Sequence, residues 1–145
     1  MDDADLSHLR RAIALASEAG AAGDPPFGSI LVNAAGTILA EDRNTTVTDD
    51  DITAHPELKL ARWAARHVPI ADAHATTMYT SCRPCPMCAN AIRRARIGRV
   101  VFALDTDQLD ALKPPGFPNP DAAVVDHVGP ALLEEARRPV ESYYR

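Results

Sequence analysis

The chain has few cysteines and no long apolar run, and each absence excludes a class of protein. Its 145 residues include only Cys82, Cys85 and Cys88, too few for the disulfide framework of a small secreted domain. No stretch approaches the roughly 18 apolar residues of a membrane-spanning helix. The first residues, Met1 to Asp5, are acidic and lack the basic-then-apolar order of a signal peptide. We therefore expect a cytoplasmic protein with no membrane partner.

Positive charge is also scarce. Lys and Arg number 15 against 20 Asp and Glu, which gives a formal net charge of −5. Because Lys and Arg supply most of the affinity for nucleic acid by neutralising phosphates, this balance favours a small substrate. Hydrophobic residues make up 46% of the chain, enough for one core, and no repeat or linker divides it. We expect residues 1–145 to form a single domain.

Strand-like and helical segments alternate along the chain, which indicates an α/β fold. Helical spacing of apolar residues and stop signals predict helices at 5–19, 56–67, 86–96 and about 130–144. Apolar and β-branched runs predict strands at 27–33, 37–41, 76–82, 99–104 and 122–128. The run 99–104 is almost continuously apolar, which predicts a strand buried on both faces. The proline-rich segment 113–120 is expected to be a loop.

Two short motifs, H-P-E at residues 55–57 and P-C-P-M-C at residues 84–88, supply a set of metal ligands. His55, Cys85 and Cys88 make three soft ligands. A catalytic zinc site keeps three protein ligands and leaves the fourth position for water, whereas a structural site closes with four. The two motifs therefore predict a catalytic Zn²⁺ site.

Glu57 is the expected catalytic residue. Positions two apart in a regular helix point in different directions, but at a helix entrance His55 and Glu57 can both reach the metal. H-x-E followed by P-C-x-x-C is typical of zinc-dependent nucleobase deaminases, in which the glutamate transfers protons. The alternative is a binding module whose structural zinc is held by three cysteines, Cys82 included, and one histidine. That interpretation leaves Glu57 without a purpose.

Longer stretches resemble the cytidine deaminase-like zinc hydrolases, in the branch of guanine deaminases and tRNA adenosine deaminases. Residues 26–32 look like the first strand of the family, and residues 51–57, D-I-T-A-H-P-E, look like its D-P-T-A-H-A-E. Residues 78–88 are close to the guanine deaminase T-S-C-E-P-C-P-M-C. The resemblance covers most of the chain. It implies a three-layer fold with a five-stranded mixed sheet of order 2-1-3-4-5 flanked by helices, zinc between two helix starts, and a homodimer.

The resemblance also implies a reaction and a substrate site. The implied activity is hydrolytic deamination of a free nucleobase or nucleobase-like heterocycle, namely a guanine-like base, an amino-pyrimidine or an amino-triazine. Phe27 and Gly28 would wall the base, and Asn44 would hold it through a paired donor and acceptor. A tRNA adenosine deaminase is the alternative within the class, disfavoured by the net charge. Guanine deaminases also use an acidic residue after the fourth strand, and the alternatives here stay open: Asp105, Asp107, Asp110, Asp121 or none of them.

Two positions depart from the pattern of the family. Pro56 stands where most relatives have alanine, and because proline has no amide hydrogen, a donor for a substrate carbonyl is expected to be missing. Arg83 replaces the usual glutamate before Pro84. These departures leave the identity of the heterocycle open.

Overall fold

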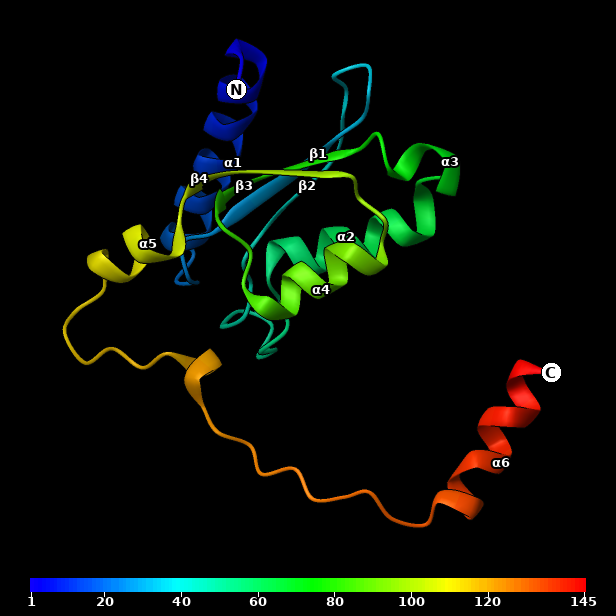
Figure 1. Cartoon of the computed structure of the whole chain (residues 1–145). Helices are drawn as coiled ribbons and strands as arrows, with labels where there is room; N and C mark the ends of the chain where they lie inside the picture. The colour runs from blue at the N-terminus through cyan, green and yellow to red at the C-terminus, as the bar shows by residue number, and fades with distance from the viewer.

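The computed structural model describes every residue from Met1 to Arg145. At its centre is a four-stranded sheet in which the strands follow the order β2-β1-β3-β4. Strand β1 is antiparallel to β2 and to β3, while β3 and β4 are parallel. The strands are β1 (Gly28–Val32), β2 (Ile38–Arg43), β3 (Thr77–Cys82) and β4 (Arg99–Leu104). Helices cover both faces of this mixed sheet, so the fold has three layers (Figure 1).

Helix α1 (Asp3–Ala21) covers one face of the sheet. Leu9 and Leu15 of this helix share a buried cluster with Ile30 of β1. The helix approaches β1 closely at Gly28, where a Cβ would lie 2.5 Å from the Cβ of Leu15. A glycine is therefore required there for packing.

A buried carboxylate also ties α1 to the sheet. Asp5, 4% exposed, accepts hydrogen bonds from the guanidinium of Arg99 at 3.0 and 2.9 Å and from the Tyr79 hydroxyl at 2.7 Å. These bonds, the one from Arg99 above all, hold the pKa of Asp5 well below its usual range. Burial and the bond to Asp5 raise the pKa of Tyr79 to about 12. Polar contacts thus join α1 to β3 and β4 in addition to core packing.

Helices α2 (Pro56–His67) and α4 (Pro86–Arg94) cover the opposite face, and the short α3 (Ile70–Ala73) follows α2. Leu31 of β1 packs against both α2 and α4 there, whereas its neighbour Ile30 faces α1. Successive strand residues point to opposite faces, so one strand serves both cores. Both helices begin with proline, which fits the first helical position because its missing amide would be unpaired there.

Several expected boundaries agree with the structure, and two expectations about β4 and its surroundings do not. The helix at 56–67 and the strand at 99–104 have the predicted bounds. Helix α5 (Thr106–Leu112) was not expected; it starts with a capping box formed by Asp105 and Gln108. The prediction that β4 is buried on both faces is wrong, since only Val101 of this strand is buried. The physical reason is that β4 is an edge strand with nothing paired on its free side.

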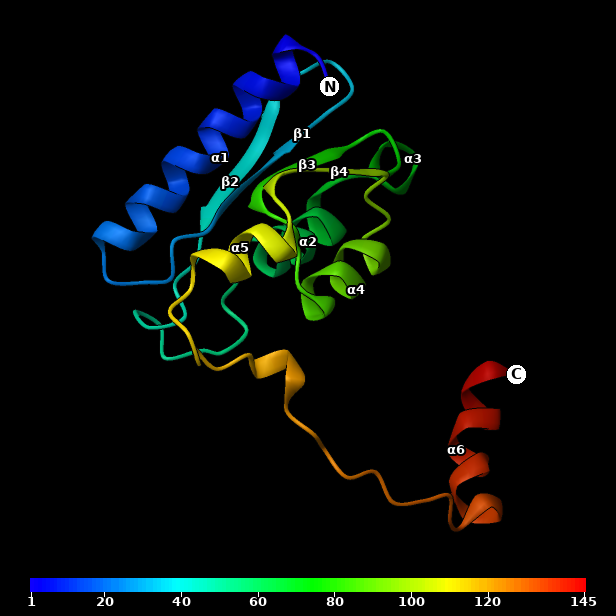
Figure 2. The ribbon, with the colours of Figure 1, turned by 60° about the vertical axis from the view of Figure 1, so that its left-hand side comes forward.

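The expected fifth strand at 122–128 is absent, so the sheet has four strands in the predicted order 2-1-3-4. A 3₁₀ turn, η1 (Pro120–Ala122), is followed by extended chain and then by α6 (Leu133–Tyr144), which starts later than expected. Figures 1 and 2 show this segment leading away from the sheet, with α6 apart from the other helices. Because the segment leads away from the free edge of β4, it does not pair with that strand. None of the helices combines the length and apolar character that crossing a bilayer requires.

Candidate functional site

The three predicted metal ligands lie together where α2 and α4 begin. His55 is the N-cap of α2, Cys85 is the N-cap of α4, and Cys88 lies in the first turn of α4. Nδ1 of His55 is 3.6 Å from Sγ of Cys85 and 3.4 Å from Sγ of Cys88, and all the ligand atoms lie within 4.8 Å of one another. In a tetrahedral zinc site of usual bond lengths, sulfur and nitrogen ligands are about 3.6 Å apart. The three atoms therefore have the spacing that one zinc ion requires.

The electrostatics of the cluster suit a divalent cation. Hydrogen bonds with Cys88 and His55 hold the pKa of the Cys85 thiol below its usual range. The hydrogen bond to Cys85, which favours the protonated thiol of Cys88, raises the pKa of Cys88 together with burial. A cation that takes the place of the remaining protons would allow both sulfurs to ionise. Thiolate and imidazole together are donors that zinc prefers.

Cys82 lies outside this cluster. It ends β3, is 4% exposed, and is not among the grouped ligands. Burial raises the pKa of its thiol, which is the behaviour of a small core residue. The geometry therefore gives no support to a four-ligand structural site.

Glu57 lies beside the ligands with its carboxyl shielded from solvent. The residue is 5% exposed, and its Oε1 accepts a hydrogen bond from the Thr80 hydroxyl at 2.8 Å. The Ser29 hydroxyl donates in turn to Thr80 at 2.8 Å, and the two are paired in register across β1 and β3. Burial raises the pKa of Glu57. Sequence reasoning missed Thr80 and Ser29 because their role depends on strand register.

Asn44 can offer a ligand a donor but not an acceptor. It is 2% exposed at the end of β2, and its backbone N–H donates to the carbonyl of Phe27 at 2.9 Å. Its Oδ1 accepts from both the N–H and the hydroxyl of Thr46, each at 2.9 Å. Only Nδ2 is then left, so the expectation of a paired donor and acceptor is not met.

Phe27 and Gly28 lie next to Asn44 at the start of β1. Phe27 is half-buried, and its carbonyl is joined to Asn44. The missing side chain of Gly28 points toward α1, away from the metal ligands, and its N–H donates to Ser81 at 3.1 Å. Contact of Phe27 with a substrate stays a prediction, and Gly28 could take part only through its backbone.

The entrance of α2 lacks the amide hydrogen of its first residue. A helix ordinarily begins with four unpaired N–H groups. Here Pro56, which is buried, has none. The N–H of Lys59 donates to the N-cap carbonyl at 3.1 Å. A substrate carbonyl that faces Pro56 would find no amide donor at this residue.

The structure separates the four acidic residues that follow β4. Asp105 and Asp110 are occupied in ion pairs at 3.1 and 3.2 Å, and Asp107 is exposed on α5. Asp121 adds to the rise in the pKa of His55, whose main cause is the hydrogen bond to a ligand sulfur. Which of the four serves the reaction stays a prediction.

A three-layer α/β fold with one histidine, two cysteines and a buried glutamate at two helix starts defines a zinc-dependent hydrolase. Comparison with known families identifies the family of this hydrolase. Residues 2–104 match the model of the cytidine and deoxycytidylate deaminase zinc-binding region. The chain belongs to this family. It is a zinc-binding, hydrolytic deaminase.

Similar proteins within the family act on different substrates. Guanine deaminase of Bacillus subtilis is 41% identical over 71% of this chain, which spans 67% of that protein. The X-ray structure of the same enzyme matches with a TM-score of 0.77 and 32% identity, over 99% of this chain and 94% of that one. A probable cytosine deaminase of Schizosaccharomyces pombe is 30% identical over 99% of this chain and 94% of its own length. A tRNA-specific adenosine deaminase of Haemophilus influenzae is 38% identical over 68% of this chain, which spans only 57% of that protein.

Proposed function

We propose that this protein removes the exocyclic amino group of a free nucleobase, or of a nucleobase-like heterocycle, and releases ammonia. The observation that carries the proposal is the shielded carboxyl of Glu57 beside three ligand atoms with the spacing for one zinc ion. His55, Cys85 and Cys88 would hold the metal. Zinc, when bound, lowers the pKa of a water molecule toward neutrality.

Glu57 is the group that moves protons in this proposal. It takes a proton from the nucleophilic water, whose oxygen forms a bond to the amidine carbon of the substrate. It gives this proton to the ring nitrogen, takes the second proton from the hydroxyl that has formed on the carbon, and passes it to the departing amine, so that the C–N bond breaks, a C=O bond forms and one water yields one ammonia. The hydrogen bond from Thr80 keeps the carboxyl in one orientation throughout. Nδ2 of Asn44 would donate to an acceptor on the base and so fix the orientation of the ring.

A small substrate is favoured over RNA by the distribution of charge. Three exposed arginines, Arg93, Arg94 and Arg96, lie near the end of α4, roughly 12 Å along the helix from the start that carries the ligands. They are therefore remote from the reaction centre, and the whole chain is acidic. A tRNA adenosine deaminase is the second candidate, because one such enzyme is 38% identical.

Ammonia release from a panel of substrates tests the proposal. The panel contains guanine, cytosine, adenine, isocytosine, an amino-triazine and a tRNA anticodon stem-loop. We expect the zinc-loaded protein to turn over at least one free heterocycle faster than the stem-loop. Turnover of the stem-loop alone would favour the tRNA enzyme, and a zinc-loaded protein inactive on every member would overturn deamination of such substrates.

Pro56→Ala is expected to shift preference within this panel toward heterocycles with a carbonyl, such as guanine and cytosine. Alanine returns the amide hydrogen that Pro56 lacks at this helix entrance, and a matched polar partner discriminates against analogues that leave it unpaired. We expect the ratio of kcat/KM for cytosine over the amino-triazine to rise by about tenfold, the scale of one hydrogen bond. Pro69→Ala, at the exposed N-cap of α3, is the control. Equal ratios in all three proteins would show that Pro56 does not set specificity.

We also propose that the protein is a homodimer in which the C-terminal segment contacts a second copy. Apolar side chains of this segment are exposed in one chain, with Val124 at 96% and Val128 at 94%. The unpaired edge of β4 lies next to an apolar groove between α1 and β4, lined by Leu6, Ile13 and Phe102 among others. Because the segment leads away from its own sheet (Figure 2), the matching groove is that of a second copy. Exposed apolar patches of this kind mark interfaces.

The dimer is tested by light scattering during size-exclusion chromatography. We expect the wild type to have twice the chain mass of 15.6 kDa, and the double variant Val124→Asp, Val128→Asp to have the mass of one chain. Ile70→Asp places one carboxylate at a site 71% exposed on α3 and should leave the dimer intact. A monomeric wild type would refute the proposal.

We also propose a single domain and a cytoplasmic location for this protein. Residues 1–145 act as one deaminase domain. The elements that follow the zinc ligands along the chain, β4 and α5, do not form a separate hydrophobic core. All three cysteines are free, which suits a reducing cytoplasm. No contact with nucleic acid or membrane is part of the proposal.

A further inference from the structure

The segment from Asn44 to His55 is a closed loop. It carries Asn44, the residue proposed to contact the substrate, and His55, a metal ligand. It starts where β2 ends and finishes at the N-cap of α2. The N–H of Thr45 donates to the carbonyl of Ala54 at 3.1 Å, which closes the loop at its base. Most of the loop beyond this point is exposed, from Val47 to Ile52. Its position therefore depends on the contacts that hold it to the rest of the fold.

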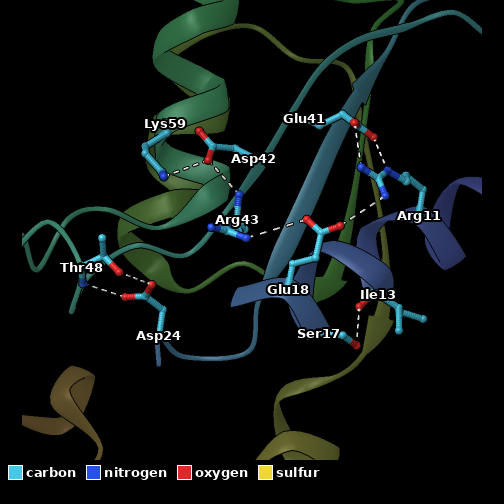
Figure 3. A network of polar contacts seen from close by, with 10 residues as sticks. All are labelled: Arg11, Ile13, Ser17, Glu18, Asp24, Glu41, Asp42, Arg43, Thr48 and Lys59. Carbon is cyan, nitrogen blue, oxygen red and sulfur yellow. Dashed lines mark hydrogen bonds and ion pairs between the residues drawn. The ribbon is translucent and has the colours of Figure 1, made fainter. Parts of the chain in front are cut away.

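A buried carboxylate from another part of the chain holds this loop. Asp24, 5% exposed, lies between α1 and β1. Its Oδ1 accepts from the N–H groups of Val47 and Thr48 at 3.0 and 2.8 Å, and its Oδ2 accepts from the Thr48 hydroxyl at 2.6 Å. Figure 3 shows the Asp24 carboxylate facing Thr48. These bonds lower the pKa of Asp24, the largest effect being that of the Thr48 hydroxyl. Hydrogen bonds to an ionised acceptor are among the strongest in proteins.

The base of the loop has an anchor of its own. Nζ of Lys59 on α2 donates to Asp42 and to the Thr45 hydroxyl, both at 2.9 Å. Figure 3 shows Lys59 and Asp42 together, next to an ion-pair network that runs through Arg43 and Glu18 to α1. Lys59 therefore fixes the start of the loop, and Asp24 fixes the residues that follow Thr46.

We propose that Asp24 is a positioning residue that sets the orientation of the Asn44 amide for substrate. The path is short, because Thr46, whose N–H and hydroxyl hold Oδ1 of Asn44, directly precedes the two residues that Asp24 binds. The inference rests on the proposed function, since it assigns Asn44 as the donor to the base. If Asp24 only stabilised the fold, loss of its carboxylate would lower stability without acting through Asn44.

Asp24→Ala and Asp24→Asn separate the two roles. Asparagine keeps an oxygen for both amide hydrogens and can donate to the Thr48 hydroxyl, so we expect near wild-type kinetics. Alanine removes all three bonds, and we expect kcat/KM to fall by about tenfold or more, because small misplacements of positioning groups are costly. Asp3→Ala, an exposed aspartate in the first turn of α1, should change kcat/KM less than about twofold.

A double-mutant cycle with Asn44→Ala decides whether the effect passes through Asn44. We expect Asp24→Ala to cause little further loss once Asn44 is alanine, since residues in one network are not additive. Additive losses, or an Asp24→Asn variant as poor as Asp24→Ala, would overturn the proposal.

A readout without turnover keeps this result apart from that of the proposed function. The side-chain amide signal of Asn44 in the NMR spectrum, assigned by its loss in Asn44→Ala, should move or broaden in Asp24→Ala and stay in place in Asp24→Asn. An unmoved signal in Asp24→Ala would refute the positioning role whatever the enzyme acts on. If the signal responds but the wild type turns over no heterocycle, the positioning role stands and the proposed substrate class fails.

Discussion

Glu57→Gln is expected to lower kcat by about 10² or more while the protein keeps its fold and its zinc. Glutamine occupies the same space and still accepts the hydrogen bond from the Thr80 hydroxyl, so the surroundings need not change. What it loses is the ability to take a proton from water and return it to the substrate. Steady-state kinetics on the best substrate of the panel, with metal content by atomic absorption, would measure both effects.

Glu41→Gln is the matched control for this result. Glu41 carries the same carboxyl, but it is exposed on β2 and paired with Arg11 on α1 at 2.6 Å. We expect this variant to keep its kcat, because exposed ion pairs contribute little to folding stability and Glu41 has no contact with the metal ligands. A fully active Glu57→Gln protein would exclude Glu57 as the proton carrier, and loss of zinc in that variant would make it a ligand.

The sequence alone predicted the parts of the site that depend on local chemistry. A proline after His55 and another after Cys85 mark two helix starts, and the structure has N-caps at both residues. Residues three apart lie on the same face of a helix, so the C-x-x-C spacing predicts that Cys85 and Cys88 lie on one side of the helix start. The meeting of the two helix starts then followed from the resemblance to a known fold.

Contacts between distant segments could not be predicted in this way. Thr80 reaches Glu57 only because β1 and β3 pair in one register, and a shift of one residue would turn Thr80 to the other face. Asp24 holds a loop more than 20 residues away through backbone amides, which carry no sequence signal. Likewise, Oδ1 of Asn44 accepts hydrogen bonds from Thr46 in a local turn. The residue is therefore left with a donor for the substrate in place of the expected donor and acceptor.

Errors at the C-terminal end have a related cause. The run 122–128 has the apolar and β-branched composition of a strand, but a strand forms only where a partner edge accepts its hydrogen bonds. In one chain the segment leads away from β4, which stays an exposed edge for the same reason. In the proposed dimer, the strand-like composition of residues 122–128 is explained, because the edge that accepts their hydrogen bonds then belongs to a second copy.

Substitution of the cysteines is expected to give the second large effect, and it distinguishes a catalytic from a structural zinc. In Cys88→Ser the cluster loses one of three soft ligands, and we expect zinc to fall from about one per chain toward none after dialysis against a mild chelator, with loss of activity. Cys82→Ser removes a sulfur that lies outside the cluster, so this variant should keep its zinc and measurable turnover.

Cys82→Ser is the matched control because both residues are buried, at 4% exposure for Cys82 and 0% for Cys88. Each change places a hydroxyl where a thiol was buried, so each carries a similar packing cost, and thermal unfolding of the two variants measures it. Metal content, and with it activity, should then separate them, because only one of the two sulfurs lies near Nδ1 of His55, at 3.4 Å. If Cys82→Ser instead lost zinc as readily as Cys88→Ser and unfolded with it, the site would have four protein ligands. No position would be left for water at the metal, and the proposed mechanism would fail.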